Sequence, residues 1–361
     1  MKIQTRNVLL VAVTLVMAYT LLFPSRLALE PAVSIDWAVP AAEVTTLPSL
    51  ADNDKTVGLQ EPQGVFFVEE GGQRGSWIAA PEAVSVANDR VARSQASPPS
   101  VEILSRYGQA IARIPGTGAP WFSGKDLALL GFGANVLDVF TQSGESRWRL
   151  ETPDLISGYC ACANGDSFVS FVGGELAWLD TQGAIRVTYR PGHGAVSAIY
   201  AMLWIESRQL LAVVVDLRPQ TLVLLAPRHE KGGNFRFELV ETVTLSRETR
   251  GQLQLHSLLD DTVLVIEQPE GLGVLLLDDS MRTVIPLTGR LVQVAGLTDA
   301  RLLVCQVESP GGSQLLGLKP DGRLVFRQSV PSQWNDLVPD SRGRLVGDSA
   351  AGVQSLHFLA R

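Results

Sequence analysis

The stretch NGDSFVSFVGGELAWLDTQGAIRVTY, from Asn164 to Tyr189, contains the pattern that decides the fold. A polar turn with Asp166 is followed at once by an apolar strand, and further strands flank the glycine of DTQG, Asp180 to Gly183. Glycine readily adopts the positive φ that a tight strand reversal requires. Apolar and polar residues alternate on both sides of this turn, as they do in half-buried strands. Together with the strand before the Asp turn, the stretch predicts four short strands in about 40 residues.

This unit recurs along the chain. Consecutive Asp-type turns are 37 to 53 residues apart, and a hairpin with glycine in its turn follows most of them. Four short strands per repeat at this period are typical of a β-propeller blade, so the sequence predicts an all-β, seven-bladed propeller over residues 64–361. The seven turns align at Asp89, Asp126, Asp166, Arg208, Asp261, Asp299 and Asp340.

The two ends of the array favour a closed ring over an open solenoid. The last unit has three strands and stops at Arg361, whereas Val65 to Glu69 is a strand left over before the first complete unit. We therefore expect this N-terminal strand to complete the last blade and leave no open edge there. A solenoid would instead need capping units.

The turn segments resemble those of the bacterial quinoprotein-like, NHL-like and WD40-like propeller superfamily. TQSGESRW (Thr141 to Trp148), DTQG and PDGRLV (Pro320 to Val325) are similar to outer hairpins of quinoprotein-type blades. DSRGRLV (Asp340 to Val346) resembles the inner turn of NHL-type blades. The Gly-His and Trp-Asp dipeptides of true WD40 repeats are absent at blade positions. The resemblance implies a propeller at the architectural level over about residues 64–361.

An uncharged run of sixteen residues, Val8 to Phe23, follows Lys2 and Arg6 near the N-terminus. It predicts a transmembrane helix over about 8–23 within an anchor of residues 1–26, although a cleaved signal sequence has a similar pattern. The basic residues would hold the N-terminus in the cytoplasm, which predicts a single-pass protein of the cytoplasmic (inner) membrane with its propeller in the periplasm. Residues 27–63 carry a net charge of −5 and several prolines, and we expect an acidic tether there. A short strand at 33–39 is compatible with this segment.

Composition and cysteine content exclude several classes of protein. The net charge of −7, without a basic cluster beyond the first thirty residues, argues against nucleic acid as a partner. Cys160 and Cys162 lack C-x-x-C spacing and, with Cys305, make an odd total, so we expect small buried apolar side chains. A bridge between Cys160 and Cys162, or from one of them to Cys305, stays open for an oxidising compartment.

The candidate binding residues lie in linkers and in one insertion. Linkers between blades should cluster on one face of a propeller, and the insertion RHEKGGN (Arg228 to Asn234) should form an exposed hairpin tip. Ordinary turn chemistry explains the same residues without a binding role. The histidines show no metal-ligand spacing, and we expect no catalytic, metal-binding or cofactor-binding residues. The candidates are Arg190, His193, Arg250 and Trp334 in the linkers, and His229 and Lys231 in the insertion.

These features predict a non-enzymatic, extracytoplasmic interaction or scaffolding propeller that is tethered to the membrane by its N-terminal helix and binds an unknown protein. A quinoprotein-like or lactonase-like propeller enzyme is an alternative, which would need metal or quinone ligands at the channel. An envelope assembly factor is another. The sequence leaves the identity of the partner and the oligomeric state open.

Overall fold

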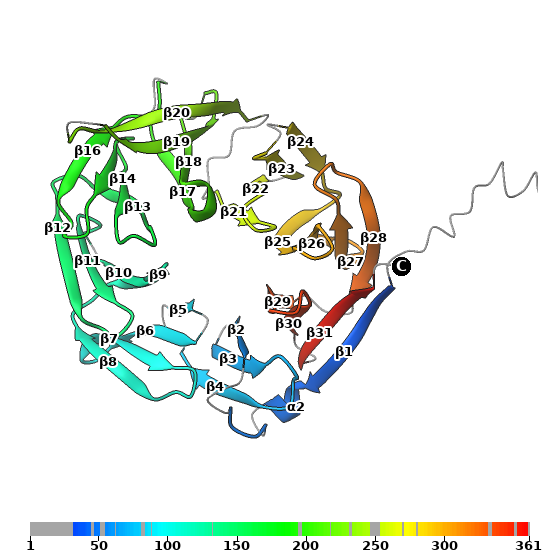
Figure 1. The fold of residues 1–361 in the computed structure, drawn as a ribbon. Coiled ribbons are helices and arrows are strands. Elements are labelled where there is room, and N and C mark those ends of the chain that lie inside the picture. The colour runs from blue at the N-terminus through cyan, green and yellow to red at the C-terminus, as the bar shows by residue number, and fades with distance from the viewer. Residues whose placement is uncertain are drawn as a thin grey trace, which may run out of the picture.

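The chain forms a ring of eight antiparallel sheets in a computed structural model, and each sheet is one blade of a β-propeller (Figure 1). The first strand of each blade lies nearest the centre of the ring, and the last lies at its rim. The structure describes residues 32–44, 47–50, 55–61, 63–80, 84–87, 89–131, 133–193, 197–216, 218–230, 233–245, 253–268, 271–278, 281–330, 334–349 and 352–359.

From β2 onward the strands follow one another around the ring in chain order. Blade 1 has three strands, β2 (Thr56–Glu61), β3 (Gly64–Glu69) and β4 (Gly75–Ala79). Blade 2 comprises β5 (Val84–Ala87), β6 (Arg90–Ala96), β7 (Pro99–Ser105) and β8 (Ala110–Pro115); blade 3 comprises β9 (Ala119–Ser123), β10 (Asp126–Leu130), β11 (Val136–Thr141) and β12 (Ser146–Glu151). Blade 4 comprises β13 (Ile156–Ala161), β14 (Ser167–Phe171), β15 (Leu176–Leu179) and β16 (Ile185–Tyr189); blade 5 comprises β17 (Ile199–Ile205), β18 (Leu210–Val215), β19 (Thr221–His229) and β20 (Phe235–Thr244).

The remaining blades complete the circle. Blade 6 comprises β21 (Leu255–Leu258), β22 (Val263–Gln268), β23 (Gly271–Leu276) and β24 (Met281–Pro286); blade 7 comprises β25 (Arg290–Leu297), β26 (Leu302–Ser309), β27 (Gly312–Leu318) and β28 (Leu324–Val330). Blade 8 comprises β29 (Trp334–Pro339), β30 (Leu345–Ser349), β31 (Gly352–Leu359) and β1 (Ala32–Pro40). The helical elements in the described part of the chain are short: α2 (Ala41–Val44) and the 3₁₀ turn η1 (Glu206–Arg208).

Recurring aspartates fix the turns because their carboxylates accept backbone N–H groups. Oδ1 of Asp180 accepts from Gln182 and Ala184 at 2.8 and 2.9 Å, and Oδ1 of Asp340 accepts from Arg342 and Arg344 at 2.9 Å. The two backbone hydrogen bonds, Ala184 first, hold the pKa of Asp180 below its ordinary value. Asp340, one of the seven aligned turn residues, therefore has the structural role that the repetition indicated. Asp126 and Asp166 instead pair with Arg147 and Arg186 of their own blades.

The core lies between neighbouring blades. Phe168 and Trp178 of blade 4, for example, pack with Leu211 and Val213 of blade 5 in one buried cluster. Apolar side chains on both faces of the middle strands are covered in this way, which is why β14 and β18 are apolar over most of their length. Cys160, Cys162 and Cys305 are buried in such clusters with free thiols, which confirms the expectation of small buried side chains.

The predicted number of blades is wrong: the ring has eight, not seven. The seven Asp-type turns all join the first two strands of a blade, from blade 2 to blade 8. Blade 1 lacks this signal because β2 and β3 are joined around Gln63, without an aspartate, and because it has only three strands. Its middle strand β3 is the segment Val65 to Glu69 that the sequence assigned to the last blade.

Closure of the ring does use an N-terminal strand, but a different one. β1 pairs antiparallel with β31 from Ala32 opposite Leu359 to Pro40 opposite Gly352, and it forms the outer edge of blade 8. Figure 1 shows β1 (blue) beside β31 (red). Strands β1 and β2 both lie within the stretch that was expected to form the acidic tether.

Among the residues that the structure describes, no helix is long and apolar enough to cross a membrane. We therefore correct the predicted fold class, which placed a transmembrane helix before the propeller, and the predicted single-pass localisation in the inner membrane that depended on it. The segment 8–23, to which that helix was assigned, lies outside the described residues.

Candidate functional site

Among the linker residues chosen from the sequence that the structure describes, Trp334 lies apart from Arg190 and His193. Arg190 and His193 are exposed between blades 4 and 5, where the His193 N–H donates to Asp216 Oδ2 at 3.0 Å. Trp334 begins β29, three blades further around the ring, and is only 4% exposed. Its indole packs on Gly347 of the neighbouring strand, so it belongs to the core of blade 8. Arg250 lies outside the described residues.

The predicted hairpin tip sits at the end of an unusually long pair of strands. β19 and β20 stay paired as far as His229 opposite Phe235, and the two rings stack with centroids 4.7 Å apart. Lys231, the other candidate at this tip, lies outside the described residues. We call the described part of this hairpin within residues 225–240 the blade 5 arm.

The blade 5 arm is braced against blade 4. Phe237 is buried on Phe168, Trp178 and Tyr189, with ring centroids 5.6 to 6.0 Å away. The Arg186 guanidinium of β16 lies 4.7 Å from the Phe235 ring centroid. One side of the arm is therefore fixed by aromatic packing, and its other side faces outward.

A β-bulge at the base of the arm exposes two neighbouring apolar side chains. The register shifts between Leu224 and Leu225, so that Val240 has no residue opposite it on β19. A bulged residue interrupts the alternation of side chains along a strand. Leu239 and Val240 are in consequence 53% and 50% exposed.

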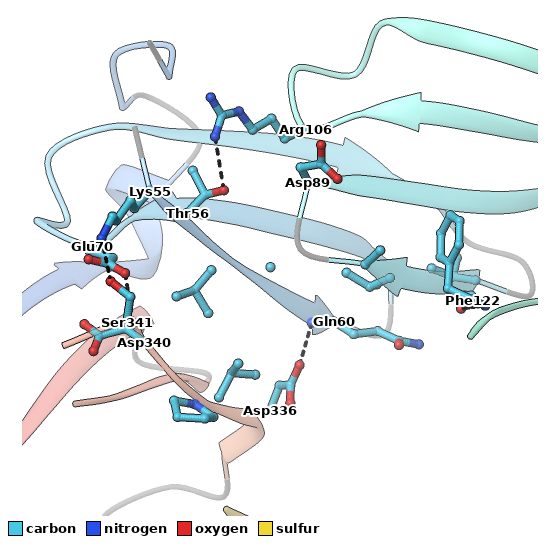
Figure 2. A pocket seen from close by; sticks show the side chains of 18 of the residues that line it. Lys55, Thr56, Gln60, Glu70, Asp89, Arg106, Phe122, Asp336, Asp340 and Ser341 are labelled. Atoms are coloured by element: carbon cyan, nitrogen blue, oxygen red, sulfur yellow. Dashed lines mark hydrogen bonds between the residues drawn. The ribbon is translucent and has the colours of Figure 1, made fainter. Parts of the chain in front are cut away.

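A cavity of about 800 Å³ lies at the centre of the ring, where the inner strands β2, β5, β9 and β29 meet. Figure 2 shows its polar groups: Lys55 beside Ser341, Arg106 beside Thr56, and Asp336 below Gln60. Lys55 Nζ donates to Ser341 Oγ at 3.3 Å, and Arg106 Nη1 lies 3.5 Å from Thr56 Oγ1. Volumes of this order are typical of pockets for small ligands.

Aromatic side chains form the remaining wall of this cavity. Phe122 and Trp121 reach it from β9, and Trp121 packs edge-on against Tyr159 with ring centroids 6.2 Å apart. Trp121 also lines a second cavity of about 240 Å³, which inner strands β13, β17 and β21 border with Ile199 and Met202. The channel thus carries Lys, Arg and Asp side chains on the side of blades 8, 1 and 2, whereas the opposite side combines apolar residues with serine, glutamine and histidine.

Three carboxylates gather where β2 meets blade 8. Asp336 Oδ2 accepts the Gln60 N–H at 2.9 Å, and Asp348, opposite Asp336 on the next strand, accepts from the Asn335 amide at 3.1 Å. Burial raises the pKa of both aspartates, and for Asp348 the charge of Asp336 adds to the effect. Burial, followed by the charge of Asp348, raises the pKa of Glu61 to about 7. These groups hold protons more strongly than ordinary surface carboxylates.

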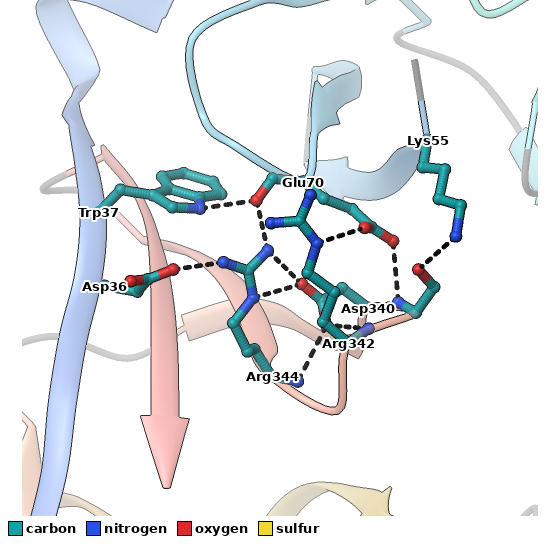
Figure 3. Close-up of polar contacts among 8 residues, drawn as sticks. Asp36, Trp37, Lys55, Glu70, Asp340, Arg342 and Arg344 are labelled. Atoms are coloured by element: carbon teal, nitrogen blue, oxygen red, sulfur yellow. Dashed lines mark hydrogen bonds and ion pairs between the residues drawn. The ribbon is translucent and has the colours of Figure 1, made fainter. Parts of the chain in front are cut away.

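A polar network beside the cavity connects the N-terminal and C-terminal parts of the chain where the ring closes (Figure 3). Arg344 of blade 8 bonds Asp340 with Nε at 2.7 Å, and its other nitrogens contact Asp36 of β1 and the Glu70 carbonyl. Glu70 of blade 1 in turn accepts the Ser341 N–H at 2.9 Å and pairs with Arg342. One guanidinium thus joins β1, the turn after β3 and the turn after β29.

The side chains that line the channel can form hydrogen bonds and ion pairs. No group of three His, Cys, Asp or Glu among the described residues could hold a metal ion. His256 pairs with Glu267 at 2.9 Å and lines the second cavity. The charged and aromatic walls of the channel are suited to holding a ligand through hydrogen bonds, ion pairs and stacking.

Sequence reasoning missed the channel residues on β2 and β29. Lys55, Gln60 and Glu61 fell in the expected tether, and Asp336 carried no motif. One signal was present: in TVGLQE (Thr56–Glu61), Val57 and Leu59 alternate with less apolar residues, and both are buried. This period-two pattern is that of a strand with one buried face.

Comparison with known proteins agrees with this architecture. A family model described as "beta-propeller protein" matches residues 1–311. The chain belongs to this β-propeller family. Among solved structures, this propeller is similar to BamB from Moraxella catarrhalis, with a TM-score of 0.60 and 13% identity, over 91% of this chain and 99% of that one. The computationally designed Ika8 protein matches with a TM-score of 0.61 and 13% identity, over 86% and 96% of the two chains.

Two further comparisons show weaker similarity. Streptogramin B lyase has a TM-score of 0.50 at 13% identity and covers 78% of this propeller and 95% of its own chain. An uncharacterized protein of Treponema pallidum (strain Nichols) is 22% identical over 190 residues, which is 53% of this chain. The alignment spans about half of that relative, 49% of its length. At these identities the solved structures show the fold alone.

Proposed function

We propose that this β-propeller is a non-enzymatic interaction module that scaffolds a protein partner through the blade 5 arm. The observation that carries the proposal is the bulge at Val240, which places Leu239 and Val240 side by side on the exposed part of β20. Contact surfaces typically have a small apolar centre surrounded by polar groups. Here the ion pairs Arg228–Glu238 and Arg236–Glu230, at 2.7 and 2.8 Å, lie along the arm beside the apolar pair.

The rigidity of the arm supports the same proposal. Its inner side is fixed by Phe237 and by Arg186 over Phe235, so that little conformational entropy is lost when a partner binds. An arm that moved freely would have to be ordered at that moment. The arm therefore offers a preformed surface.

The test compares partner capture by two variants of matched exposure. Three tagged forms are crosslinked to their partners in cells, and the bound proteins are identified by mass spectrometry. These forms are the wild type, the double variant Leu239→Asp/Val240→Asp and the control Val284→Asp. Val284 is 55% exposed on β24, the outer strand of blade 6. We expect a protein that is recovered with wild type and the control and lost with the double variant.

Two outcomes would overturn the proposal. One is recovery of the same protein by all three forms, which would move the contact away from the arm. The other is the absence of any specific protein together with turnover of a substrate by the purified propeller. That result would favour an enzyme acting at the channel.

A further inference from the structure

The inner edge of β2 is a wall of the large cavity, and its backbone faces the channel. The Lys55 carbonyl accepts the Glu70 N–H at 3.0 Å, on the side of β3, whereas the Gln60 N–H points the other way, to Asp336. Backbone groups of alternate residues point to opposite sides of an antiparallel strand. Gly58 therefore directs its N–H and C=O groups to the same side as Gln60, and it lines the cavity. An extended peptide pairs with a strand edge of this kind.

The charges along this edge are arranged by sign. Lys55 and Arg106 lie where β2 begins, and Asp336 lies where it ends (Figure 2). Asp336 accepts the N–H groups of Gln60 and Leu337 and has no cation as a partner among the described residues. Thr56 and Gln60 are four residues apart, which corresponds to about 13 Å along a strand.

From this edge and these charges we propose that the cavity binds a short free peptide of about three residues, extended antiparallel to β2. Its terminal ammonium meets Asp336, and its terminal carboxylate meets Lys55 and Arg106. Three extended residues span about 10 Å, and the hydrogen bonds at both ends complete the distance between the opposite charges. The ammonium lies where β2 ends and the carboxylate lies where β2 begins, so the peptide runs antiparallel to β2.

The side wall of the cavity fits the same ligand. Trp121 and Phe122 on β9 both border this space, although the side chains of consecutive strand residues point to opposite faces and the Trp121 ring packs on Tyr159 of blade 4. An apolar or aromatic central residue gains contact area there, and large aromatic surfaces contribute strongly to such contacts. The peptide site lies in the channel and does not use the blade 5 arm, so it stands independently of the proposed partner surface.

Calorimetric titration of the full chain with the tripeptide Ala-Phe-Ala tests the site. The free tripeptide is compared with its N-acetylated form and its C-terminal amide, because each cap removes one charge. We expect each cap to weaken binding about tenfold, as the loss of one charge-assisted hydrogen bond would. Asp336→Asn should remove the effect of the acetyl cap alone, and Lys55→Gln should reduce the effect of the amide cap.

Matched exposed residues serve as controls. Asp154→Asn and Lys125→Gln change exposed side chains that do not line the cavity and should leave both cap effects unchanged. The inference is overturned if the free tripeptide does not bind, if the caps have no effect, or if Asp336→Asn behaves as Asp154→Asn does. Leu239→Asp/Val240→Asp should bind the tripeptide as wild type does, which separates this result from the test of the arm.

Discussion

Replacing Arg344 with alanine should destabilise the ring more than any loss of a surface ion pair. Its side chain is 8% exposed, that of Asp340 is fully buried, and the same guanidinium reaches β1 and blade 1. Removal of one partner from a buried pair costs about 3–5 kcal/mol. Asp340 keeps two backbone N–H donors at 2.9 Å after the change, so we place the loss at the lower end, about 3 kcal/mol.

Equilibrium unfolding in urea, followed by tryptophan fluorescence, measures this loss. With an m-value of about 3 kcal/mol per molar, the midpoint should fall by about 1 M. The control is Arg290→Ala, whose pair with Glu308 is 2.7 Å long but 70% and 42% exposed, and which should cost less than about 1 kcal/mol. Equal losses for Arg344→Ala and Arg290→Ala would refute the reasoning, because burial would then have no effect on the strength of the pair.

Three further predictions concern the core and the carboxylates. Burial raises the pKa of the three thiols, that of Cys305 to about 12. A thiol reagent at neutral pH should therefore label the native protein far more slowly than the unfolded chain, and equal rates would contradict this. The folded pKa of Glu61, about 7 against 4.5, means that the folded state binds more protons in that window. The free energy of unfolding should therefore fall as the pH rises from 4.5 to about 7, with a smaller slope in Glu61→Gln, when midpoints in urea are measured across this range. Gly347→Ala would place Cβ 1.9 Å from the Trp334 ring and should cost at least about 1–3 kcal/mol in urea unfolding, whereas Gly173→Ala, with nothing within 4 Å, should cost far less.

Blades 2 to 8 could be predicted from the sequence because their turns carry local sequence signals. Six of the seven aligned inner turns carry an aspartate, and in one of them the Asp340 carboxylate accepts the N–H groups two and four residues later. Asp180 forms the same two hydrogen bonds in an outer hairpin. A glycine with positive φ, such as Gly183 or Gly322, marks the outer hairpin. These signals are local, so they survive in a single sequence.

Blade 1 and the closure could not be predicted in this way. Gln60 bonds Asp336 and Lys55 bonds Ser341, so β2 runs antiparallel to β29. Blade 1 also has only three strands and lacks the Asp-type turn, so a search for the common unit passes over it. The pairing of β1 with β31 joins residues more than 300 positions apart. Nothing local in β1 indicates its partner, and the acidic residues and prolines of residues 27–63 favoured a tether.

The two candidate sites also differ in how far they could be predicted from the sequence. The blade 5 arm was found because an insertion is visible in one repeat, although its apolar pair at Leu239 and Val240 depends on a bulge in the pairing. The channel cavity was missed because its residues come from four blades, and each is unremarkable in its own segment. Asp336 and Lys55 line the same cavity only because the ring closes between them.

Closure and the cavity use the same groups, and this has a consequence for stability. Glu70 and Asp340 line the cavity and also hold the network around Arg344 and Arg342. Ser341 connects the two, because its N–H donates to Glu70 and its hydroxyl accepts from Lys55. A ligand that bridges β2 and β29 binds only when the ring is closed, so its binding free energy adds to the closure. The junction between the two ends of the chain is therefore the place where binding in the channel and stability of the propeller are coupled.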